Sequence, residues 1–171
     1  MKRKYHILTI VVSGIIILDQ ASKFYIEQTM RLHQSRVIIE GLFNLTHIRN
    51  PGAAFGILAD HENGVRTLFL TGVGLLAVLL LAFYFTRSPE EAWLSHLSFA
   101  LILGGAFGNL LDRIRLGAVV DFLDFYVGQF HWPAFNVADS SISVGLTLLV
   151  ILSFVKRKRH KDHELLLRES S

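Results

Sequence analysis

Long uncharged stretches constrain the fold of this chain more than any other feature of its sequence. Residues 68–85 contain no Lys, Arg, Asp or Glu. As a helix rising 1.5 Å per residue they would cover about 27 Å, close to the roughly 30 Å hydrocarbon core of a bilayer. Hydrophobic residues make up 51% of the chain and charged residues only 18%. These proportions exclude an ordinary soluble domain and predict an integral membrane protein.

Stretches of this kind predict four membrane-spanning helices. The predicted spans cover residues 5–26, 67–86, 92–111 and 137–155. The basic start before the first apolar run is also typical of a secretory signal peptide. However, the small residues Ala21 and Ser22 come after Asp19 and Gln20, so no A-x-A-like cleavage site follows the run. We therefore expect an uncleaved first transmembrane helix.

The positions of the cations predict which way the helices cross the membrane. Lys and Arg near span ends are retained on the cytoplasmic side. Basic residues stand before the first span and after the fourth: Lys2, Arg3, Lys4, Lys156, Arg157, Lys158, Arg159 and Lys161. Both termini are therefore expected in the cytoplasm, as an even number of spans permits. Residues 27–66 and 112–136 then lie on the outer side, and residues 156–171 form a polar, frayed cytoplasmic tail.

The outer segments hold the structure that is not helical. Residues 37–49 are rich in β-branched and apolar side chains and end at the turn signal Asn50-Pro51-Gly52, which favours a short strand. No repeat or low-complexity linker divides the chain, so residues 1–171 are expected to form one domain. The predicted fold class is an α-helical integral membrane protein of the cytoplasmic (inner) membrane. It has four transmembrane helices and a small β-containing segment on the outer membrane surface.

Composition removes several kinds of chemistry. The chain has no cysteine, which excludes disulfide scaffolds, thiolate nucleophiles and Cys-ligated metal sites. Its 8 His residues are dispersed and form no H-E-x-x-H motif, so we expect no metal and no cofactor. The sequence pI of about 9.4 arises from cations beside apolar stretches. That placement favours contact with membrane lipid over binding of nucleic acid.

Four aspartates at predicted span ends or in the outer loop are the candidate functional acids: Asp19, Asp112, Asp121 and Asp139. An ionisable side chain costs about 2.5 to 3.5 kcal/mol at the centre of a membrane helix, so each acid requires an explanation. Two carboxylates about 3 Å apart do not both ionise, and such a pair sharing one proton hydrolyses peptide bonds in aspartic proteases. The residues alone leave open which two of the four acids meet.

Most of these acids also have an ordinary structural interpretation. The alternatives are a helix cap for Asn136 with Asp139, an i,i+4 ion pair for Asp19 with Lys23, and an interfacial salt bridge for Asp112 with Arg113. Asp121 has no such local partner, because its neighbours Val120 and Phe122 are apolar.

Two patterns along the predicted helices indicate packing faces. Gly104 and Gly108 share one helix face in a small-xxx-small pattern, which indicates close helix approach rather than chemistry. The fourth span has a polar face formed by Asn136, Asp139, Ser140, Ser143 and Thr147, which is expected to be turned towards protein rather than lipid.

Two other functions are compatible with parts of the sequence. Ser22-Lys23 and Ser153-x-x-Lys156 suggest a serine–lysine membrane peptidase, although the second pair falls on the predicted cytoplasmic side. The non-enzymatic alternative is a small membrane transporter or assembly factor in which the aspartates relay protons or pack helices.

Five sequence blocks carry a resemblance to a known family. They are LDQASK at 18–23, NPGAAF at 50–55, GGAFGNLLDR at 104–113, VVDF at 119–122 and FNVAD at 135–139. In this order and at this spacing, along nearly the whole chain, they resemble the blocks of lipoprotein signal peptidase. This is the bacterial signal peptidase II family of membrane aspartyl proteases.

The resemblance implies the pairing that the residues alone leave open. By position, Asp121 and Asp139 match the family's catalytic aspartates. Supporting or substrate-binding roles are implied for Asp19, Lys23, Asn50, Gly52, Asn109, Asp112, Arg113 and Asn136. Within the pair, Asp139 at a helix start is expected to be the ionised base more often, and Asp121 among apolar neighbours to carry the shared proton.

The resemblance also implies a substrate and an inhibitor. The family removes signal peptides from prolipoproteins by cleaving before a cysteine already modified with diacylglycerol, and its active site lies near the outer membrane face. Cyclic peptide antibiotics such as globomycin occupy the same cleft. The implied partners of this chain are therefore diacylglyceryl-modified prolipoproteins, membrane lipid and globomycin-like peptides.

Overall fold

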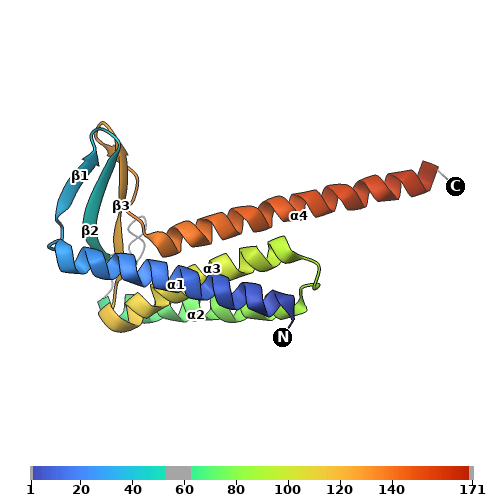
Figure 1. Cartoon of the computed structure of the whole chain (residues 1–171), viewed down its shortest axis with the longest axis horizontal. Helices are drawn as coiled ribbons and strands as arrows, with labels where there is room; N and C mark the ends of the chain where they lie inside the picture. The colour runs from blue at the N-terminus through green and yellow to red at the C-terminus, as the bar shows by residue number, and fades with distance from the viewer. Residues whose placement is uncertain (1, 53–62, 170–171) are drawn as a thin grey trace.

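The structure, a computed structural model, describes residues 2–52 and 63–169. Its elements in chain order are α1 (Arg3–Thr29), β1 (Ser35–Ile39), β2 (Phe43–Asn50), α2 (Asn63–Arg87), α3 (Trp93–Leu116), β3 (Val119–Val127), β4 (Phe130–His131) and α4 (Val137–Glu169). Figure 1 shows α1, α2 and α3 running alongside one another, with the sheet standing across one end of this bundle. α4 starts beside the sheet and diverges from the other helices along its length.

All four helices contain a stretch long and apolar enough to cross a membrane. These stretches are Arg3–Thr29, Thr67–Arg87, Trp93–Leu116 and Val137–Val155. The predicted fold class, a four-helix integral membrane protein with a small β-containing segment, is confirmed. The most apolar part of α3 is 61% buried, against 11 to 17% for the other three, so α3 forms the centre of the bundle.

The end of α3 differs from its prediction. The helix continues to Leu116, past the expected end at residue 111, because no helix breaker occurs before Gly117. Gly117 adopts the left-handed conformation with φ 70° and its N–H donates to Arg113 O, which is a common helix C-cap. Asp112 and Arg113 therefore lie on α3, beyond the predicted end of the third span.

The basic tail also differs from its prediction. α4 continues without a break to Glu169, so the expectation of a frayed segment is wrong for the part of the tail that the structure describes. Residues 156–169 contain neither Gly nor Pro and are rich in Lys, Arg, Glu and Leu, which are strong helix formers.

A single four-stranded antiparallel sheet, in the order β1-β2-β3-β4, stands at one end of the helices. The one strand predicted over residues 37–49 is instead a hairpin, because Gly41 with φ 76° permits a turn between β1 and β2. The pairing of β2 with β3 shifts register between Leu45 and Ile48, which marks a β-bulge in β2. β3 places Asp121 opposite Ile48. Residues 53–55 of the NPGAAF block lie outside the described residues.

Glycines allow α3 to pack closely against α1 and α4. A Cβ on Gly104 would lie 2.9 Å from Ile15 Cβ of α1, and one on Gly105 would collide with the backbone oxygen of Ala138 in α4. On Gly108 it would lie 2.5 Å from Asp19 Oδ2. The packing role predicted for Gly104 and Gly108 is confirmed. The same close contacts bring the polar side chains of α1 and α4 to α3.

Candidate active site

A buried ion cluster joins α1 to α3 at the end of the bundle next to the sheet. Lys23 Nζ lies 2.8 Å from Asp19 Oδ2 and 2.8 Å from Asp112 Oδ2. Its third donor goes to Asn109 Oδ1, at 3.1 Å. Lys23, Asp19 and Asp112 are each at most 2% exposed. An ammonium group has three protons, so Lys23 is fully satisfied although it lies away from water.

The two carboxylates of this cluster also hold the starts of two other elements. Asp19 Oδ1 accepts the backbone N–H of Ala138 in the first turn of α4, at 2.9 Å. Asp112 Oδ2 accepts the backbone N–H of Val120, the residue before Asp121, at 3.1 Å. The i,i+4 pair of Asp19 with Lys23 exists as the structural interpretation predicted. The predicted Asp112–Arg113 salt bridge is replaced by the Asp112–Lys23 pair.

Asp121 is held by the side chains of two asparagines. Asn136 Nδ2 donates to Asp121 Oδ1 at 2.7 Å, and Asn50 Nδ2 donates to Asp121 Oδ2 at 3.0 Å. The amide of Asn50 is oriented by its own turn, because Gly52 N–H donates to Asn50 Oδ1 at 2.9 Å. Gly52 has φ 97°, a backbone conformation that favours glycine, which explains why glycine occupies this position of the NPG turn.

Asp139 is held at the N-terminus of α4 by a reciprocal cap. Asn136 Oδ1 accepts Asp139 N–H at 2.9 Å, and Asp139 Oδ2 accepts Asn136 N–H at 3.2 Å. This is a capping-box geometry, so the helix-cap interpretation of these two residues is confirmed. The other oxygen, Asp139 Oδ1, accepts Asn109 Nδ2 at 2.8 Å. The cap and the candidate site are therefore built from the same atoms.

The three asparagines share a feature that sets the direction of their amides. Each carbonyl oxygen faces a group that only donates: the Lys23 ammonium for Asn109, the Asp139 N–H for Asn136 and the Gly52 N–H for Asn50. Each NH₂ group must therefore point the other way. All three point at a carboxylate of Asp121 or Asp139, so the donors around the two acids are fixed before any ligand binds.

Both acids line one open cavity of about 1040 Å³. Its wall comes from β2, β3, the segment before α4 and the first turns of α4: Ile48, Arg49, Asn50, Pro51, Asp121, Trp132, Pro133, Ala134, Phe135, Asp139, Ser140, Ser143 and Val144. Ser143 and Thr147 are exposed, so the prediction that the polar face of α4 turns towards protein is wrong for these two residues. The first part of this polar face instead lines the cavity, through Asp139, Ser140 and Ser143.

The environment of Asp121 favours its protonated form. Burial, followed by the nearby negative charge of Asp139, raises the pKa of Asp121 from 3.8 to about 7. The hydrogen bonds from Asn50 and Asn136 act in the opposite direction and are outweighed. The two carboxylates are therefore near enough to influence each other's ionisation. Asp121 is an acid that holds a proton near neutral pH.

Arg113 donates from Nη1 to Asn109 O at 3.4 Å, but it does not line the cavity that holds the two aspartates. It lines a neighbouring cavity of about 630 Å³ between α2 and the end of α3. Arg49 lines both this cavity and the one that holds the aspartates. The sequence analysis did not identify it as a candidate site residue. Gln20 was missed as well: its Nε2 donates to Asp19 Oδ2 at 3.1 Å and to Asp112 Oδ1 at 3.0 Å. Its position inside the LDQASK block was the available signal.

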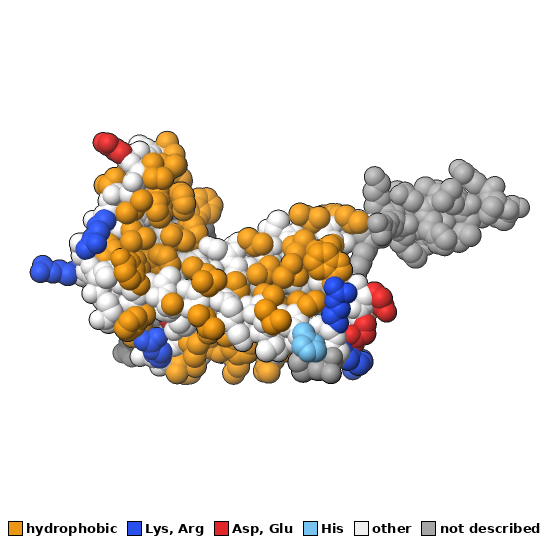
Figure 2. Space-filling view, in the orientation of Figure 1, with side chains coloured by type: hydrophobic (Ala, Val, Ile, Leu, Met, Phe, Trp, Pro, Cys, Tyr) orange, Lys and Arg blue, Asp and Glu red, His pale blue; other side chains and the backbone are white. Residues whose placement is uncertain are grey.

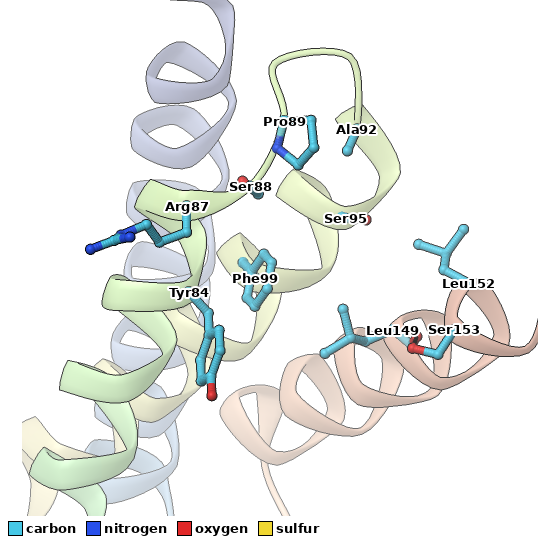
Figure 3. A pocket seen from close by; sticks show the side chains of 10 residues that line it. All are labelled: Tyr84, Arg87, Ser88, Pro89, Ala92, Ser95, Phe99, Leu149, Leu152 and Ser153. Carbon is cyan, nitrogen blue, oxygen red and sulfur yellow. Dashed lines mark hydrogen bonds between the residues drawn. The ribbon is translucent and has the colours of Figure 1, made fainter. Parts of the chain in front are cut away.

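The serine residues of the alternative serine–lysine peptidase do not form a site. Ser153 lines a cavity of about 250 Å³ between α2, α3 and α4, shown with Tyr84, Phe99 and Leu149 in Figure 3. Its hydroxyl donates to Leu149 O of its own helix, and Ser22 donates to Asp19 O. Ser153 stands about 21 Å along α4 from Asp139, at 1.5 Å per residue. Among the described residues, no three His, Asp or Glu side chains form a metal-binding group.

Solved structures similar to this one define the class of protein. One, described as a bacterial membrane enzyme structure solved by the in meso method at 2.3 Å resolution, aligns with a TM-score of 0.78 at 30% identity, covering 90% of each chain. Another, described in the same words at 1.9 Å resolution, gives a TM-score of 0.74 at 31% identity, covering 85% of this chain and 90% of that one. The fold is thus that of a bacterial membrane enzyme.

Sequence comparison narrows the class to one family. The signal peptidase (SPase) II family matches residues 11–155. A relative from Syntrophus aciditrophicus called lipoprotein signal peptidase is 46% identical over 158 residues, covering 92% of this chain and 98% of the relative. A relative of the same name from Geobacter sulfurreducens is 47% identical over 161 residues, covering 94% and 99%. This chain belongs to the signal peptidase II family, which is a family of aspartic proteases.

Proposed function

We propose that this membrane protease removes signal peptides from diacylglyceryl-modified prolipoproteins by cleaving before the lipidated cysteine, with Asp121 and Asp139 as its catalytic pair. The observation that carries the proposal is that both carboxylates line one open cavity and each accepts two fixed N–H donors. The name of the relatives, lipoprotein signal peptidase, supports lipoprotein precursors as the substrate class. No metal or cofactor is required for the proposed reaction.

In the proposed reaction the pair starts with one proton, carried by Asp121. Asp139, with a helix N-terminus favouring its negative charge, accepts a proton from water while the water oxygen attacks the scissile carbonyl carbon. Asp121 donates its proton to the carbonyl oxygen. The proton on Asp139 then passes to the departing nitrogen as the C–N bond breaks, and one hydroxyl proton of the tetrahedral intermediate returns to Asp121. The products are the carboxyl group of the signal peptide and the free amino group of the lipidated cysteine.

The other residues position this pair. Asn50 and Asn136 hold Asp121, while Asn109 and the Asn136 backbone hold Asp139. The Lys23 cluster fixes the direction of the Asn109 amide from behind. We assign Arg113, whose positive charge acts on both catalytic carboxylates, to binding the substrate peptide from the neighbouring cavity.

We place the sheet and the cavity at the outer face of the inner membrane, with both termini in the cytoplasm. The cations at both chain ends support this orientation, since Lys and Arg are retained on the cytoplasmic side. With the cavity at the boundary, the acyl chains of the substrate remain in lipid while its peptide reaches the carboxylates. Globomycin-like cyclic peptides are proposed to fill the same cavity and to compete with the substrate.

The test is cleavage of a diacylglyceryl-modified peptide by the purified full chain in detergent. Asp121→Asn and Asp139→Asn should each lower kcat by at least about 100-fold, the lower end of what a positioned acid or base contributes. In cells depleted of their own enzyme, either variant should cause lipidated prolipoprotein to accumulate. Activity of the wild type should survive chelators.

Asp124→Asn is the matched control. Asp124 is another buried acid on the same strand as Asp121, but it pairs with Asn44 and His131 and does not line the cavity. It should keep most of its activity. Normal cleavage by either Asp121→Asn or Asp139→Asn would overturn the catalytic pair, and no cleavage by the wild type would favour the transporter or assembly-factor alternative.

A further inference from the structure

A cavity that the proposed reaction does not use lies where the end of α1 meets the β1–β2 hairpin. Its volume is about 940 Å³, and its wall includes Arg31, Arg36, Arg49, Glu27 and His47. Figure 2 shows basic side chains standing out at the sheet end of the molecule beside a broad hydrophobic surface. The cavity therefore combines positive charge with a position next to the lipid-facing side of α1.

His47 gives this cavity a buried hydrogen-bonding group without a partner. The side chain is 4% exposed, and its Nδ1 lies 3.0 Å from Met30 O. A carbonyl oxygen only accepts, so Nδ1 must carry the proton, and Nε2 of the neutral ring is left as an acceptor. Nε2 has no hydrogen-bond partner among the described residues. An unpaired buried polar atom costs about 1–3 kcal/mol, so a ligand that donates to Nε2 would recover stability.

The fold places His47 here by a specific device. The β-bulge between Leu45 and Ile48 inserts one extra residue into β2, so the consecutive side chains of Thr46 and His47 are both buried. A regular strand would have turned one of them outward. The His47 backbone is fixed too, because its N–H donates to Gln34 O and its C=O accepts His33 N–H.

The charges around His47 are suited to one phosphate group. Arg36 is braced by a hydrogen bond from Nη2 to Thr29 O at 2.9 Å, and Arg49 is partly neutralised by Glu27 Oε1 at 3.3 Å. The guanidinium of Arg31 makes no hydrogen bond or ion pair within residues 2–52 and 63–169. Two of the three arginines are thus uncompensated, and arginine binds phosphate oxygens through paired N–H groups.

We propose that this cavity binds the headgroup of an anionic glycerophospholipid that carries a free hydroxyl. Arg31 and Arg36 hold the phosphate, and a headgroup hydroxyl donates to His47 Nε2. The acyl chains follow the outside of α1, where Phe24 is 59% and Tyr25 is 60% exposed near the helix end. Such aromatic residues mark the membrane–water boundary, which is the depth of a phosphate. The inference does not depend on the proposed catalytic function.

The experiment is a lipid titration of the purified full chain in detergent, with bound lipids counted by native mass spectrometry. The probe is dioleoylphosphatidylglycerol. The comparison lipids are dioleoylphosphatidylethanol, which has the same charge but no hydroxyl, and the zwitterionic phosphatidylcholine. We expect phosphatidylglycerol to bind most tightly, by up to about tenfold over phosphatidylethanol, the range of one hydrogen bond. Phosphatidylcholine should bind weakest.

Variants separate the site from general attraction to anionic lipid. Arg31→Gln with Arg36→Gln should weaken phosphatidylglycerol binding by about 25-fold, from roughly fivefold for each arginine. Arg3→Gln, at the other end of α1, removes a cation as well and should leave the affinity unchanged. His47→Phe should abolish the preference over phosphatidylethanol. If His47→Phe does not fold, the wild-type comparison of these two lipids still tests the hydroxyl contact.

Three results would overturn the proposal. Equal binding of phosphatidylglycerol and phosphatidylcholine would remove the headgroup site. An equal loss in the Arg3 and the Arg31–Arg36 variants would reduce it to diffuse electrostatics. Displacement of phosphatidylglycerol by an equimolar amount of soluble glycerol 3-phosphate would assign the cavity to a free phosphate ester instead of a lipid.

Discussion

The two buried lysines of α1 lie at opposite ends of the bundle and are held by different kinds of partner. Lys23, beside the sheet, is enclosed by the carboxylates of Asp19 and Asp112 and by Asn109 Oδ1. Lys4, at the other end, donates to the carbonyl oxygens of Thr86 and Ser88, both at 3.2 Å, and lies 3.5 Å from Glu90. Lys23 is thus bound by two buried carboxylates, and Lys4 by carbonyl oxygens at the end of α2 together with one exposed carboxylate.

The different partners of the two lysines indicate different roles for the two ends of the bundle. Lys4 fastens α1 to the link between α2 and α3, where its partners can also bond to water. Lys23 lies away from water. Its ammonium group sets the direction of the Asn109 amide, which in turn donates to Asp139. At the sheet end, Lys23 therefore orients a hydrogen-bond donor of the candidate site. At the opposite end, Lys4 holds α1 against the end of α2.

The largest effect is expected from Lys23→Met. Removing the ammonium leaves two buried carboxylates facing each other, and breaking a buried ion pair from one side costs about 3–5 kcal/mol. The variant should lose that much free energy of unfolding, and its activity should be lost with the orientation of Asn109. Denaturant unfolding followed by tryptophan fluorescence in detergent measures the first quantity. A loss below about 1 kcal/mol would mean that the cluster does not hold the sheet end together.

A smaller loss of activity is expected from Asn109→Ala, which also removes the Oδ1 acceptor of Lys23 and therefore lowers the free energy of unfolding. This change removes the 2.8 Å hydrogen bond to Asp139 Oδ1. A hydrogen bond to a charged group contributes about 1.5–3 kcal/mol, which corresponds to a fall in kcat/KM of roughly 10- to 150-fold. Asn109→Asp is the informative companion, because it keeps the size but replaces the donor with a carboxylate oxygen that repels Asp139. Unchanged kcat/KM in both variants would contradict the role of fixed donors.

The pH dependence of activity tests the environment of Asp121. The proposed reaction needs Asp121 protonated, and the pKa of Asp121 is raised to about 7. Activity should therefore fall as pH rises above about 7, approaching tenfold for each further pH unit. Because the folded-state pKa lies above the unfolded value, ionising Asp121 also weakens the fold as pH rises between about 4 and 7. Asp121→Asn should abolish this loss of stability, and a loss that persists in the variant would assign it to another group.

The smallest effect is expected from Lys4→Met. Methionine fills the volume, and the freed carbonyl oxygens lie at an end where water reaches them. The free energy of unfolding should drop by only about 1 kcal/mol, the net value of an ordinary hydrogen bond, and kcat/KM should not change. The same unfolding and cleavage assays apply. An effect as large as that of Lys23→Met would erase the contrast between the two ends.

The sequence predicted the helices well because uncharged runs of membrane-spanning length have few alternative folds. It placed the end of α3 too early, since hydropathy falls at Asp112 although the helical hydrogen bonds continue to Gly117. Lys4 was assigned only to membrane orientation, and its buried contacts depend on the link between α2 and α3 folding back over it. The end of α3 follows from the local cap at Gly117, which hydropathy does not detect, whereas the contacts of Lys4 depend on tertiary packing.

The candidate site was only partly accessible from the residues. Periodicity and charge identified four aspartates but not which two share a cavity, because β3 and α4 are brought together by contacts with α1 and α3. The family resemblance supplied Asp121 and Asp139. It did not supply the directions of the three asparagine amides, which depend on the positions that the folded chain gives to the donors facing them. His47 was overlooked because its burial comes from a bulge in β2 that depends on pairing with β3.

The cap at the start of α4 has a consequence for when the two carboxylates come together during membrane insertion. Asp139 takes its position only when Asn136 and Asn109 bond to it and Asp19 receives the Ala138 N–H. A growing chain that has inserted three helices holds Asp121 without a second carboxylate, and therefore has no pair to share a proton. If the proposed pair carries out the hydrolysis, a chain that has not yet inserted α4 is expected to be inactive.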